Sequence, residues 1–401
     1  MNTRAESLSH HQMESGSYTI EVIETGDDLN RCREEWLNLL DKVPTHEFHQ
    51  NPDNIQMQLA HTCGGTRLRI FLIRKGGTLC CIAPFALVKG QFRLSLGIIP
   101  LWRFSLHQYR LYGTNLILAK QADPQGCLYA LAEALRKRQN EYRLIYIESL
   151  PYSSPLYRAN NPLPGFRIYP AGAKRNIVWG LRTSNSFAEY LSTFRKKRRY
   201  NLNRSVRLLG EAFQGDYSIE KVTRPEQVEE FLVAVDAIYE NCWQKNTYGA
   251  FRHSTPGNIA YHRSLARSGW LRSYLLRGGG TPVAYIIGYQ YRSRYYYEYI
   301  GYDQKWGKLS PGTVLTYRMI EDLHTHDRPE ILDFGYGDSS YKRLFGNFSH
   351  EANYTHIVPG SSPMRMVLLV QLGLSRLYDT ISRILIRTGL DKKARKVLKR
   401  Q

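Results

Sequence analysis

The sequence predicts an α/β (α+β) protein of two similar units, each a mixed, mainly antiparallel sheet flanked by helices, followed by a basic amphipathic helix. Three observations predict it: an internal repeat, the same order of elements after each copy, and positive charge concentrated in two stretches. The chain has 401 residues, 42% of them hydrophobic, which is enough for two or three domains with their own cores.

The internal repeat reads as a strand, a glycine-rich hairpin and a second strand. Residues 68–87 (LRIFLIRKGGTLCCIAPFAL) and 271–290 (LRSYLLRGGGTPVAYIIGYQ) are identical at seven of twenty positions, at a constant offset of 203. The identical positions include Arg-x-Gly-Gly-Thr, and a Gly-Gly pair between apolar runs predicts a tight hairpin. The pattern favours two copies of one α/β unit.

A helix and a further strand are predicted after each hairpin, at 126–138 and 143–149 in the first copy and at 312–324 and 330–334 in the second. The expected organisation is a flexible leader (1–16), a first unit (17–180), a second unit (181–360) and a helical tail (361–401). The leader has no apolar run of the kind that secretory signals carry, and no segment reaches the roughly 18 apolar residues of a spanning helix. We therefore expect a cytoplasmic protein.

The net charge of +20 is concentrated in residues 182–209 and 361–401. Such local concentration predicts anionic partners at two places. The six cysteines form no C-x-x-C pair, and no histidines have metal-ligand spacing, so we expect buried thiols and no metal. Cys80 and Cys81 are adjacent in an apolar strand and would face opposite ways.

Residues 295–342 contain an aromatic strand, a small-residue loop, a helix, a second strand and an acidic glycine turn. A small-residue loop that opens a helix presents backbone N–H groups to a phosphate. The motifs are Tyr-x-Tyr-x-Gly-Tyr-Asp (297–303), Ser-Pro-Gly (310–312) and Asp-Phe-Gly-x-Gly-Asp-x-x-Tyr-Lys (333–342). In this order they resemble the CelD-like, or BioF-like, acetyltransferase family of the GNAT superfamily, which is met in polysaccharide biosynthesis loci. The resemblance is strongest over 184–345 and implies tandem GNAT-like units, as in FemAB-type proteins.

The resemblance implies that acyl-CoA, with acetyl-CoA as the leading candidate, binds by its pyrophosphate at the loop before the helix. The expected cofactor-binding residues are Gly307, Ser310, Pro311, Gly312 and Thr313. Ser310 suits a helix N-cap, Pro311 suits the first helical turn, and Gly312 would let a ligand approach the backbone. The superfamily loop, Arg/Gln-x-x-Gly-x-Gly/Ala, is matched only in its first half by Gln304-x-x-Gly307, so a simple capped helix start stays open.

The expected catalytic residues are Glu298, Asp333 and Tyr341. Glu298 lies mid-strand, where desolvation would raise the pKa of a carboxyl and suit it as a general base. The alternative is a Glu on the solvent face that pairs with Arg292 or Arg294. Asp333 ends a short strand, where it binds a ligand or ties down its own glycine turn. The resemblance implies that Tyr341 protonates the leaving thiolate, although a packed aromatic residue fits equally.

A basic helix is predicted from Ser186, with Glu189 completing its capping box. Its cations contact a phosphorylated substrate, a glycolipid head group or tRNA, or else form a solvated face. The expected substrate-binding residues are Arg195, Lys196, Arg199, Tyr302, Asp303 and Lys342. In the tail, Leu374, Leu377, Ile381, Ile384 and Leu385 have helical spacing, so this helix lies on the inner membrane surface or folds back on the body.

These features favour an acyl-CoA-dependent N- or O-acyltransferase that modifies a sugar or lipid-linked saccharide precursor, with no metal and no DNA partner. The first alternative is a FemAB-type transferase that uses aminoacyl-tRNA, which the basic helix and the altered loop favour. The second is a non-catalytic, membrane-associated component of polysaccharide synthesis.

Overall fold

The computed structural model describes residues 13–15, 17–43, 47–61, 64–97, 99–158, 163–172 and 176–387. The chain forms two compact units, which are described separately. Unit 1 comprises Met1–Gln56, Gly65–Asn176 and Glu351–Gln401, and unit 2 comprises Met57–Gly64 and Ile177–His350. The C-terminal part differs from the expected ranges, because β15 (Phe348–Pro359) pairs with strands of unit 1 and α12 (Met364–Arg387) packs beside it.

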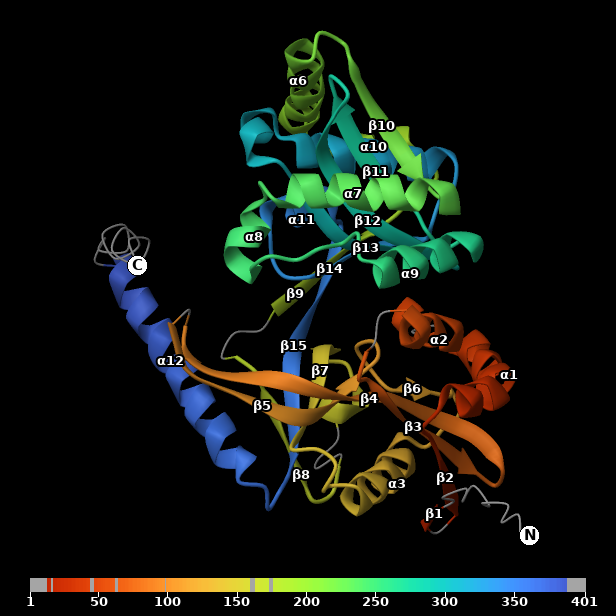
Figure 1. Cartoon of the computed structure of the whole chain (residues 1–401). Coiled ribbons are helices and arrows are strands. Elements are labelled where there is room, and N and C mark those ends of the chain that lie inside the picture. Colours follow the sequence, from red (N-terminus) through yellow and green to blue (C-terminus); the bar gives the residue numbers. More distant parts are fainter. Residues whose placement is uncertain are drawn as a thin grey trace, which may run out of the picture. The chain divides into compact units, whose positions relative to one another are not determined.

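Among the strands of unit 1, β5 and β7 are parallel and the other neighbours in the described ranges pair antiparallel (Figure 1). Its strands, in sheet order, are β1 (Met13–Ser15), β2 (Tyr18–Ile23), β3 (Arg67–Lys75), β4 (Thr78–Leu96), β5 (Ile99–Leu111), β7 (Leu144–Pro151) and β15. Two short strands pair at its margins, β6 (Ile117–Leu118) with β4 and β8 (Phe166–Pro170) with β15. The helices are α1 (Gly26–Lys42), η1 (Phe48–Gln50), α2 (Pro52–His61), α3 (Pro124–Lys137), α4 (Pro155–Arg158) and α12.

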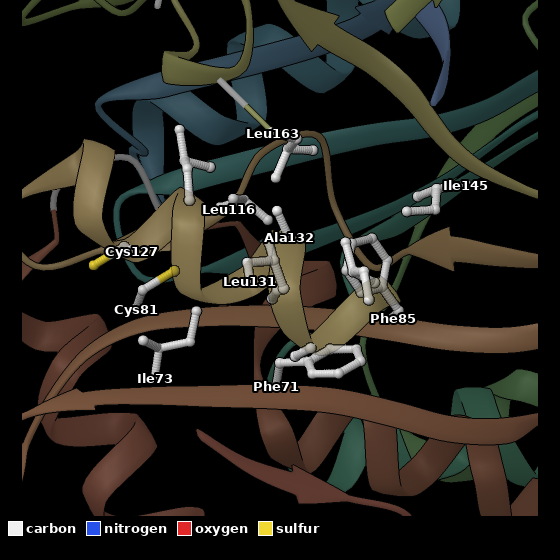
Figure 2. Close-up of a cluster of buried hydrophobic side chains, with 14 of the residues drawn as sticks. Phe71, Ile73, Cys81, Phe85, Leu116, Cys127, Leu131, Ala132, Ile145 and Leu163 are labelled. Atoms are coloured by element: carbon white, nitrogen blue, oxygen red, sulfur yellow. The ribbon is translucent and has the colours of Figure 1, made fainter. Parts of the chain in front are cut away.

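The two faces of this sheet bury separate apolar clusters, because successive strand residues point to opposite sides. Ile145 and Ile357 lie in the cluster with α3, whereas their neighbours Leu144 and Val358 lie in the cluster with α12. Figure 2 shows the first cluster, where Leu131 of α3 lies among side chains of the sheet. α3 begins at Pro124 behind the N-cap Asp123, whose carboxylate accepts the Gln125 N–H at 3.0 Å.

Among the strands of unit 2, β13 and β14 are parallel and the other neighbours are antiparallel (Figure 1). In sheet order its strands are β9 (Asn176–Arg182), β14 (Ile331–Tyr336), β13 (Arg294–Tyr302), β12 (Thr281–Tyr291), β11 (Ser273–Gly278) and β10 (Tyr217–Val222). The helices are α5 (Phe187–Ser192), α6 (Lys196–Ala212), η2 (Pro225–Gln227), α7 (Val228–Tyr239), α8 (Trp243–Tyr248), α9 (Pro256–Arg267), η3 (Gln304–Leu309), α10 (Pro311–Thr325) and α11 (Ser340–Phe345). The core between α10, α6 and the sheet contains Tyr295, Tyr297 and Leu315, while α7 packs on β12 and β13 from the other face.

The repeated hairpin predicted from the sequence is confirmed in both units. Gly76 and Gly77 turn β3 into β4 with φ of 55° and 80°, and Gly279 and Gly280 turn β11 into β12 with φ of 55° and 71°. Two successive positive φ values are the requirement of a tight type I′ turn, which glycine meets at low cost. The mixed, mainly antiparallel fold class is likewise confirmed.

Three local expectations were wrong. The basic helix is interrupted between α5 and α6, because Phe194 turns into the core against Tyr190 (ring centroids 4.8 Å apart) and Arg195 is extended. Cys80 and Cys81 share one core cluster around Cys127, because Cys80 is the extra residue of a β-bulge and alternation fails there. Met13–Ser15, expected in the flexible leader, pair with β2.

Five of the six cysteines are buried, as expected, and Cys63 lies outside the described residues.

Candidate functional site

The open edge of β13, defined as Tyr297–Tyr302, is the central feature of unit 2. β13 and β14 pair in parallel at only three positions, the last being Tyr296 with Asp333. β13 then continues for six residues, to Tyr302, and no strand in the described part of the chain pairs with that edge. Unpaired N–H and C=O groups on a strand edge are a template for an extended ligand.

A β-bulge at Glu298 coincides with the start of the open edge. Ile287 pairs with Tyr299 and Gly288 with Tyr297, so Glu298 has no counterpart on β12. Bulges increase local twist and re-aim side chains. The bulge therefore explains why β13 turns away from β14 directly after Tyr296.

Glu298 is partly buried and lies near His262 of α9 and Tyr289 of β12. Burial lowers the pKa of His262 to about 4, and the Glu298 carboxylate acts in the opposite direction. His262 Nδ1 lies 2.8 Å from Asn258 O, and its Nε2 lies 3.2 Å from the Tyr289 hydroxyl. A neutral imidazole that donates from Nδ1 would accept from Tyr289, which gives Glu298 a polar neighbour with a defined hydrogen-bond direction.

One of the two arginines expected as a partner of Glu298, Arg294, pairs with Asp333. Arg294 Nη1 lies 3.3 Å from Asp333 Oδ2. Asp333 also accepts the Gly335 N–H at 2.8 Å, so it ties down its own glycine turn. This is the structural alternative left open for Asp333, since both contacts hold its carboxylate in place.

The loop before α10 lies on the other face of β13. Ser310 has φ 54° and ψ 47° and makes no side-chain cap, contrary to expectation, because the left-handed conformation ends η3 and turns the chain into Pro311. Its carbonyl accepts the N–H groups of Thr313 (3.0 Å) and Val314 (3.1 Å). Pro311 occupies the first helical position, as predicted.

The glycines of this loop allow close packing against β13. Gly312 is buried, and a Cβ there would lie 3.3 Å from Tyr302 Cδ1 and 3.4 Å from Ile300 Cδ1. A Cβ at Gly307 would lie 3.7 Å from Tyr302 Cε2. Glycine at 312 therefore brings the helix close to the strand, which is a different reason from the ligand approach that we expected.

Asp303 and Tyr302 belong to this loop region in different ways. Tyr302 packs against the glycines, whereas Asp303 caps η3 by accepting the Lys305 N–H at 2.9 Å. Asp303 also lines a cavity of about 390 Å³. The other residues that line this cavity are Glu240, Asn241, Cys242, Asn246, Gln304 and Lys305. Exposed Lys305 and Lys308 place positive charge on η3, next to the N-terminus of α10.

Lys342 is buried and anchors the turn that follows β14. Its Nζ donates to the carbonyls of Tyr336 (2.6 Å) and Gly335 (3.2 Å). Burial lowers the pKa of Lys342 to about 8, although the nearby Asp333 carboxylate opposes the shift. In the described structure Lys342 therefore holds backbone rather than presenting a free charge to a substrate.

Tyr341 of α11 packs against Tyr297 of β13. Its ring centroid lies 5.9 Å from that of Tyr297, whose hydroxyl lies 3.0 Å from Thr316 Oγ1 of α10. Burial raises the pKa of Tyr341 well above its ordinary value. The phenol therefore stays protonated at neutral pH, as a proton donor requires.

The predicted substrate-binding cations of α6 lie away from this loop. Helix α5, which precedes α6, packs near the end of α10, where the ring of Tyr190 lies 5.5 Å from that of His324. Phe194, just before α6, packs on the same Tyr190, with ring centroids 4.8 Å apart. The other end of α6 carries Phe213, which packs on Trp306 of η3 at 4.8 Å. Arg199 donates to the Phe194 carbonyl at 2.6 Å, while Arg195 and Lys196 are exposed. The structure thus does not bring Arg195, Lys196 and Arg199 together with Ser310.

An Asp–His pair on the α7 face was not predicted from the sequence. His253 Nδ1 lies 3.0 Å from Asp236 Oδ1, and the ring packs against Tyr239, Phe251 and Tyr285. Burial lowers the pKa of His253, and the hydrogen bond to Asp236 opposes the shift. The carboxylate fixes the proton on Nδ1, and Nε2 has no partner among the described residues, so the ring can accept a proton there. Asp236 and His253 are 17 positions apart on a helix and a loop, and no motif marks them.

No group of three or more His, Cys, Asp or Glu residues in the described ranges is arranged to hold a metal ion. Within the same ranges, no helix is both long and apolar enough to cross a membrane.

Comparisons with known proteins agree with this geometry. Residues 196–343 match the family described as Acetyltransferase (GNAT) domain. Among solved structures, FemX is similar with a TM-score of 0.57 and 11% identity, over 84% of this chain and 98% of that chain. A tandem GNAT protein from the clavulanic acid biosynthesis pathway is similar with a TM-score of 0.51 and 14% identity, over 85% of this chain and 99% of that chain. The search of curated proteins found no match. The protein carries a GNAT acetyltransferase domain and is a GNAT-type acyltransferase.

Proposed function

We propose that this GNAT-type acyltransferase transfers an acyl group, most simply acetyl, from acyl-CoA to an amine or hydroxyl of a sugar or lipid-linked saccharide precursor. The observation that carries the proposal is the open edge of β13, which has the start of α10 on one face and Glu298 on the other. Membership of the CelD-like family and a role in polysaccharide biosynthesis are part of this proposal.

The residues around the open edge fit an acyl-CoA. The positive end of the α10 dipole, with Lys305 and Lys308 of η3 beside it, suits a pyrophosphate. The pantetheine arm is extended and carries two amides, and the edge of β13 beyond Tyr296, where pairing with β14 ends, offers it strand-like hydrogen bonds. Two carbonyls of this edge already accept side-chain donors, Ile300 O from Gln244 Nε2 at 2.6 Å and Tyr302 O from Cys242 Sγ at 3.0 Å, which leaves the other backbone groups of the segment for the ligand. When bound, this group supplies an acyl carbon already activated as a thioester.

Two side chains would move protons on opposite sides of the transfer. Glu298 accepts the proton of the acceptor N–H or O–H, with Tyr289 and His262 as its polar neighbours. Tyr341 donates its phenolic proton to the thiolate sulfur that leaves. The acyl–sulfur bond breaks as the acyl–nitrogen or acyl–oxygen bond forms, and no covalent enzyme intermediate is needed.

The face that carries Glu298 suits a saccharide. Trp243, Phe251 and Tyr299 expose 46%, 58% and 57% of their surface, and α8 reaches the end of β13 because Gln244 Nε2 donates to Ile300 O at 2.6 Å. Flat aromatic faces pack against the C–H faces of sugar rings and leave the hydroxyls free for hydrogen bonds. Asp236 and His253 form part of the same wall.

A second candidate donor is aminoacyl-tRNA. The observation that favours it is the set of exposed cations along α6, far more positive charge than a compact acyl-CoA needs. A tRNA would engage these cations, and they are otherwise left without a role in the transfer.

Release of free thiol from acetyl-CoA, measured with a panel of amino sugars, nucleotide sugars and lipid-linked sugars, tests the proposal. Acceptor-dependent thiol release that Glu298→Gln abolishes supports it. Copurifying tRNA, together with transfer from aminoacyl-tRNA and none from acetyl-CoA, would instead establish the second candidate.

A further inference from the structure

Helix α12 of unit 1 has two apolar faces and only one of them packs on the protein. Met364 and Leu368 are buried against Phe92 and Leu106 of the β4–β5 hairpin. Gln371 on the same side accepts the Ser95 N–H through Oε1 at 2.8 Å. The helix is therefore held along the hairpin by one face (Figure 1).

The other apolar face of α12 is exposed. Its members are Met366, Leu369, Val370, Leu377, Ile381 and Ile384, of which Met366 exposes 65% and Leu377 51% of its surface. At about 100° per residue, all but Leu369 fall within an arc of about 60° on the helical wheel, directed well away from Leu368. A contiguous apolar stripe of this length is a mark of an interaction surface.

The tip of the β4–β5 hairpin also carries exposed apolar residues. Ile99, Leu101 and Trp102 are exposed, Trp102 by 68%. The tip lies against α12, since a Cβ on Gly97 would meet the Tyr378 ring. Together with the stripe on α12, these three residues form what we call the hairpin–helix surface.

Positive charge flanks the apolar stripe of α12. Arg376 and Arg383 are exposed on one flank of the helix, on the same side of the wheel. Arg93 and Arg103 of the hairpin are also exposed, but they alternate with Phe92 and Phe104, which face α12, and so they point to the other face of the hairpin.

We propose that the hairpin–helix surface docks on an anionic lipid bilayer, with α12 lying in the interface plane and Trp102 at head-group depth. Amphipathic helices bind in this way through apolar burial plus attraction of flanking cations to anionic lipids, and Trp favours that depth. A second copy of the chain fits less well, because symmetric contact would bring arginines of like charge together. The sequence predicted membrane contact for the tail alone, and the structure adds the hairpin tip.

Flotation of the full chain with lipid vesicles tests the proposal. The vesicles are pure phosphatidylcholine, or phosphatidylcholine with one quarter phosphatidylglycerol. Leu377→Glu is the test variant and Trp102→Ala probes the hairpin. Val233→Glu is the matched control, because Val233 is an aliphatic residue on helix α7 of unit 2 with a similar exposure of 53%. Thermal melting confirms that each variant is folded.

We expect binding to the anionic vesicles that weakens at high salt, with a partition coefficient about tenfold lower for Leu377→Glu and unchanged for Val233→Glu. Trp102→Ala should weaken binding as well. Absence of vesicle binding by the folded wild type, equal binding to both lipid compositions, or equal binding by Leu377→Glu would overturn the proposal. So would a dimer in sedimentation that Leu377→Glu dissociates, since a second copy would then occupy the surface. Acyl-CoA binding is measured separately, so failure of either proposal leaves the other standing.

Discussion

Arg74 and Arg277 are 203 positions apart, and each links a strand (β2 or β10) to the long helix that follows it in the chain (α1 or α7). Arg74 binds Glu21 of β2 at 2.8 Å and Glu35 of α1 at 2.5 Å. Arg277 lies 4.0 Å from Glu220 of β10 and 2.6 Å from Glu230 of α7. Each arginine also follows a β-bulge, at Ile73/Arg74 and at Leu276/Arg277. The two units thus repeat an ion-pair arrangement as well as a turn.

The two ion-pair arrangements should contribute unequally to stability. Arg74→Met should lower the free energy of unfolding by about 1–2 kcal/mol, because its side chain is 18% exposed and holds two carboxylates. Arg277→Met should cost less than about 1 kcal/mol, because Glu230 is 77% exposed and solvent screens that pair. Denaturant unfolding of the full chain measures both, and equal losses would contradict the comparison.

The units differ where the proposed donor binds. β5 pairs with β7 up to Arg110 and ends one residue later, at Leu111. β13 pairs with β14 up to Tyr296 and continues six residues to Tyr302. Only unit 2 therefore has a long open strand edge at this position, which supports donor binding in unit 2 and a scaffold or acceptor-side role for unit 1.

Glu298→Gln should lower kcat by about 10²- to 10⁴-fold, which is the usual contribution of a general base. The amide keeps the size of the side chain, so thermal stability and acyl-CoA affinity should stay close to wild type. Initial rates of thiol release with a saturating acceptor measure the effect. Retention of wild-type kcat would remove Glu298 from the mechanism and direct attention to His253.

Tyr341→Phe tests the proton donor. The variant keeps the packing on Tyr297 and removes the hydroxyl, so we expect kcat to fall about 10- to 100-fold with little change in melting temperature. If protonation of the leaving group limits the rate, the substitution should lower kcat less with an acyl thioester whose leaving thiolate is small and weakly basic than with acetyl-CoA. An unchanged kcat would assign Tyr341 to packing alone.

Asp236→Asn should loosen the loop that carries His253. Burial pushes the pKa of Asp236 upward, but hydrogen bonds from Ser254 and His253 outweigh it and the pKa is lowered. A depressed pKa means that this carboxylate stabilises the fold above its unfolded pKa and loses the effect as pH falls through the folded value. We expect Asp236→Asn to lower the free energy of unfolding by about 1–3 kcal/mol at pH 7, and by less in acid. Denaturant unfolding of the wild type and the variant, from pH 7 into the acid range, measures this difference. A pH-independent difference would contradict it.

Lys342→Met should reveal the cost of burying a charge. The folded pKa of about 8 is below the ordinary 10.5, so the unfolded chain holds more protons between these values and stability rises with pH across that window. Relative to Lys342→Met, the wild type should gain about 3 kcal/mol in unfolding free energy between pH 7.5 and 10.5. A constant difference would mean that Lys342 titrates normally.

Local chemistry made much of the fold predictable. Gly76–Gly77 and Gly279–Gly280 mark the hairpins, and Pro311 marks the start of α10. The features that the sequence did not predict depend on distant partners. The break before α6 follows from burial of Phe194 in the core, and the contact of Asp236 with His253 needs α7 and the loop after α8 to be in place.

The candidate site was predictable only where it depends on local sequence. The strand–loop–helix order around Ser310 predicted the site, but the backbone conformation of Ser310 and the packing of Gly312 on Tyr302 depend on how closely α10 approaches β13. The bulge at Glu298 also depends on its neighbour, since only the register with β12 makes Glu298 the extra residue. Side-chain periodicity carries no information about either.

Calorimetric titration of acetyl-CoA into the full chain tests the central claim, donor binding in unit 2, most directly. Thr313→Glu puts a carboxylate in the first turn of α10, where the helix dipole tolerates it but a pyrophosphate would be repelled. Gln125→Glu makes the same change in the first turn of α3 in unit 1. We predict that the wild type binds acetyl-CoA at one site. The affinity of this site should be at least about tenfold lower in Thr313→Glu and unchanged in Gln125→Glu. No binding to the wild type, or binding that only Gln125→Glu weakens, would contradict the account.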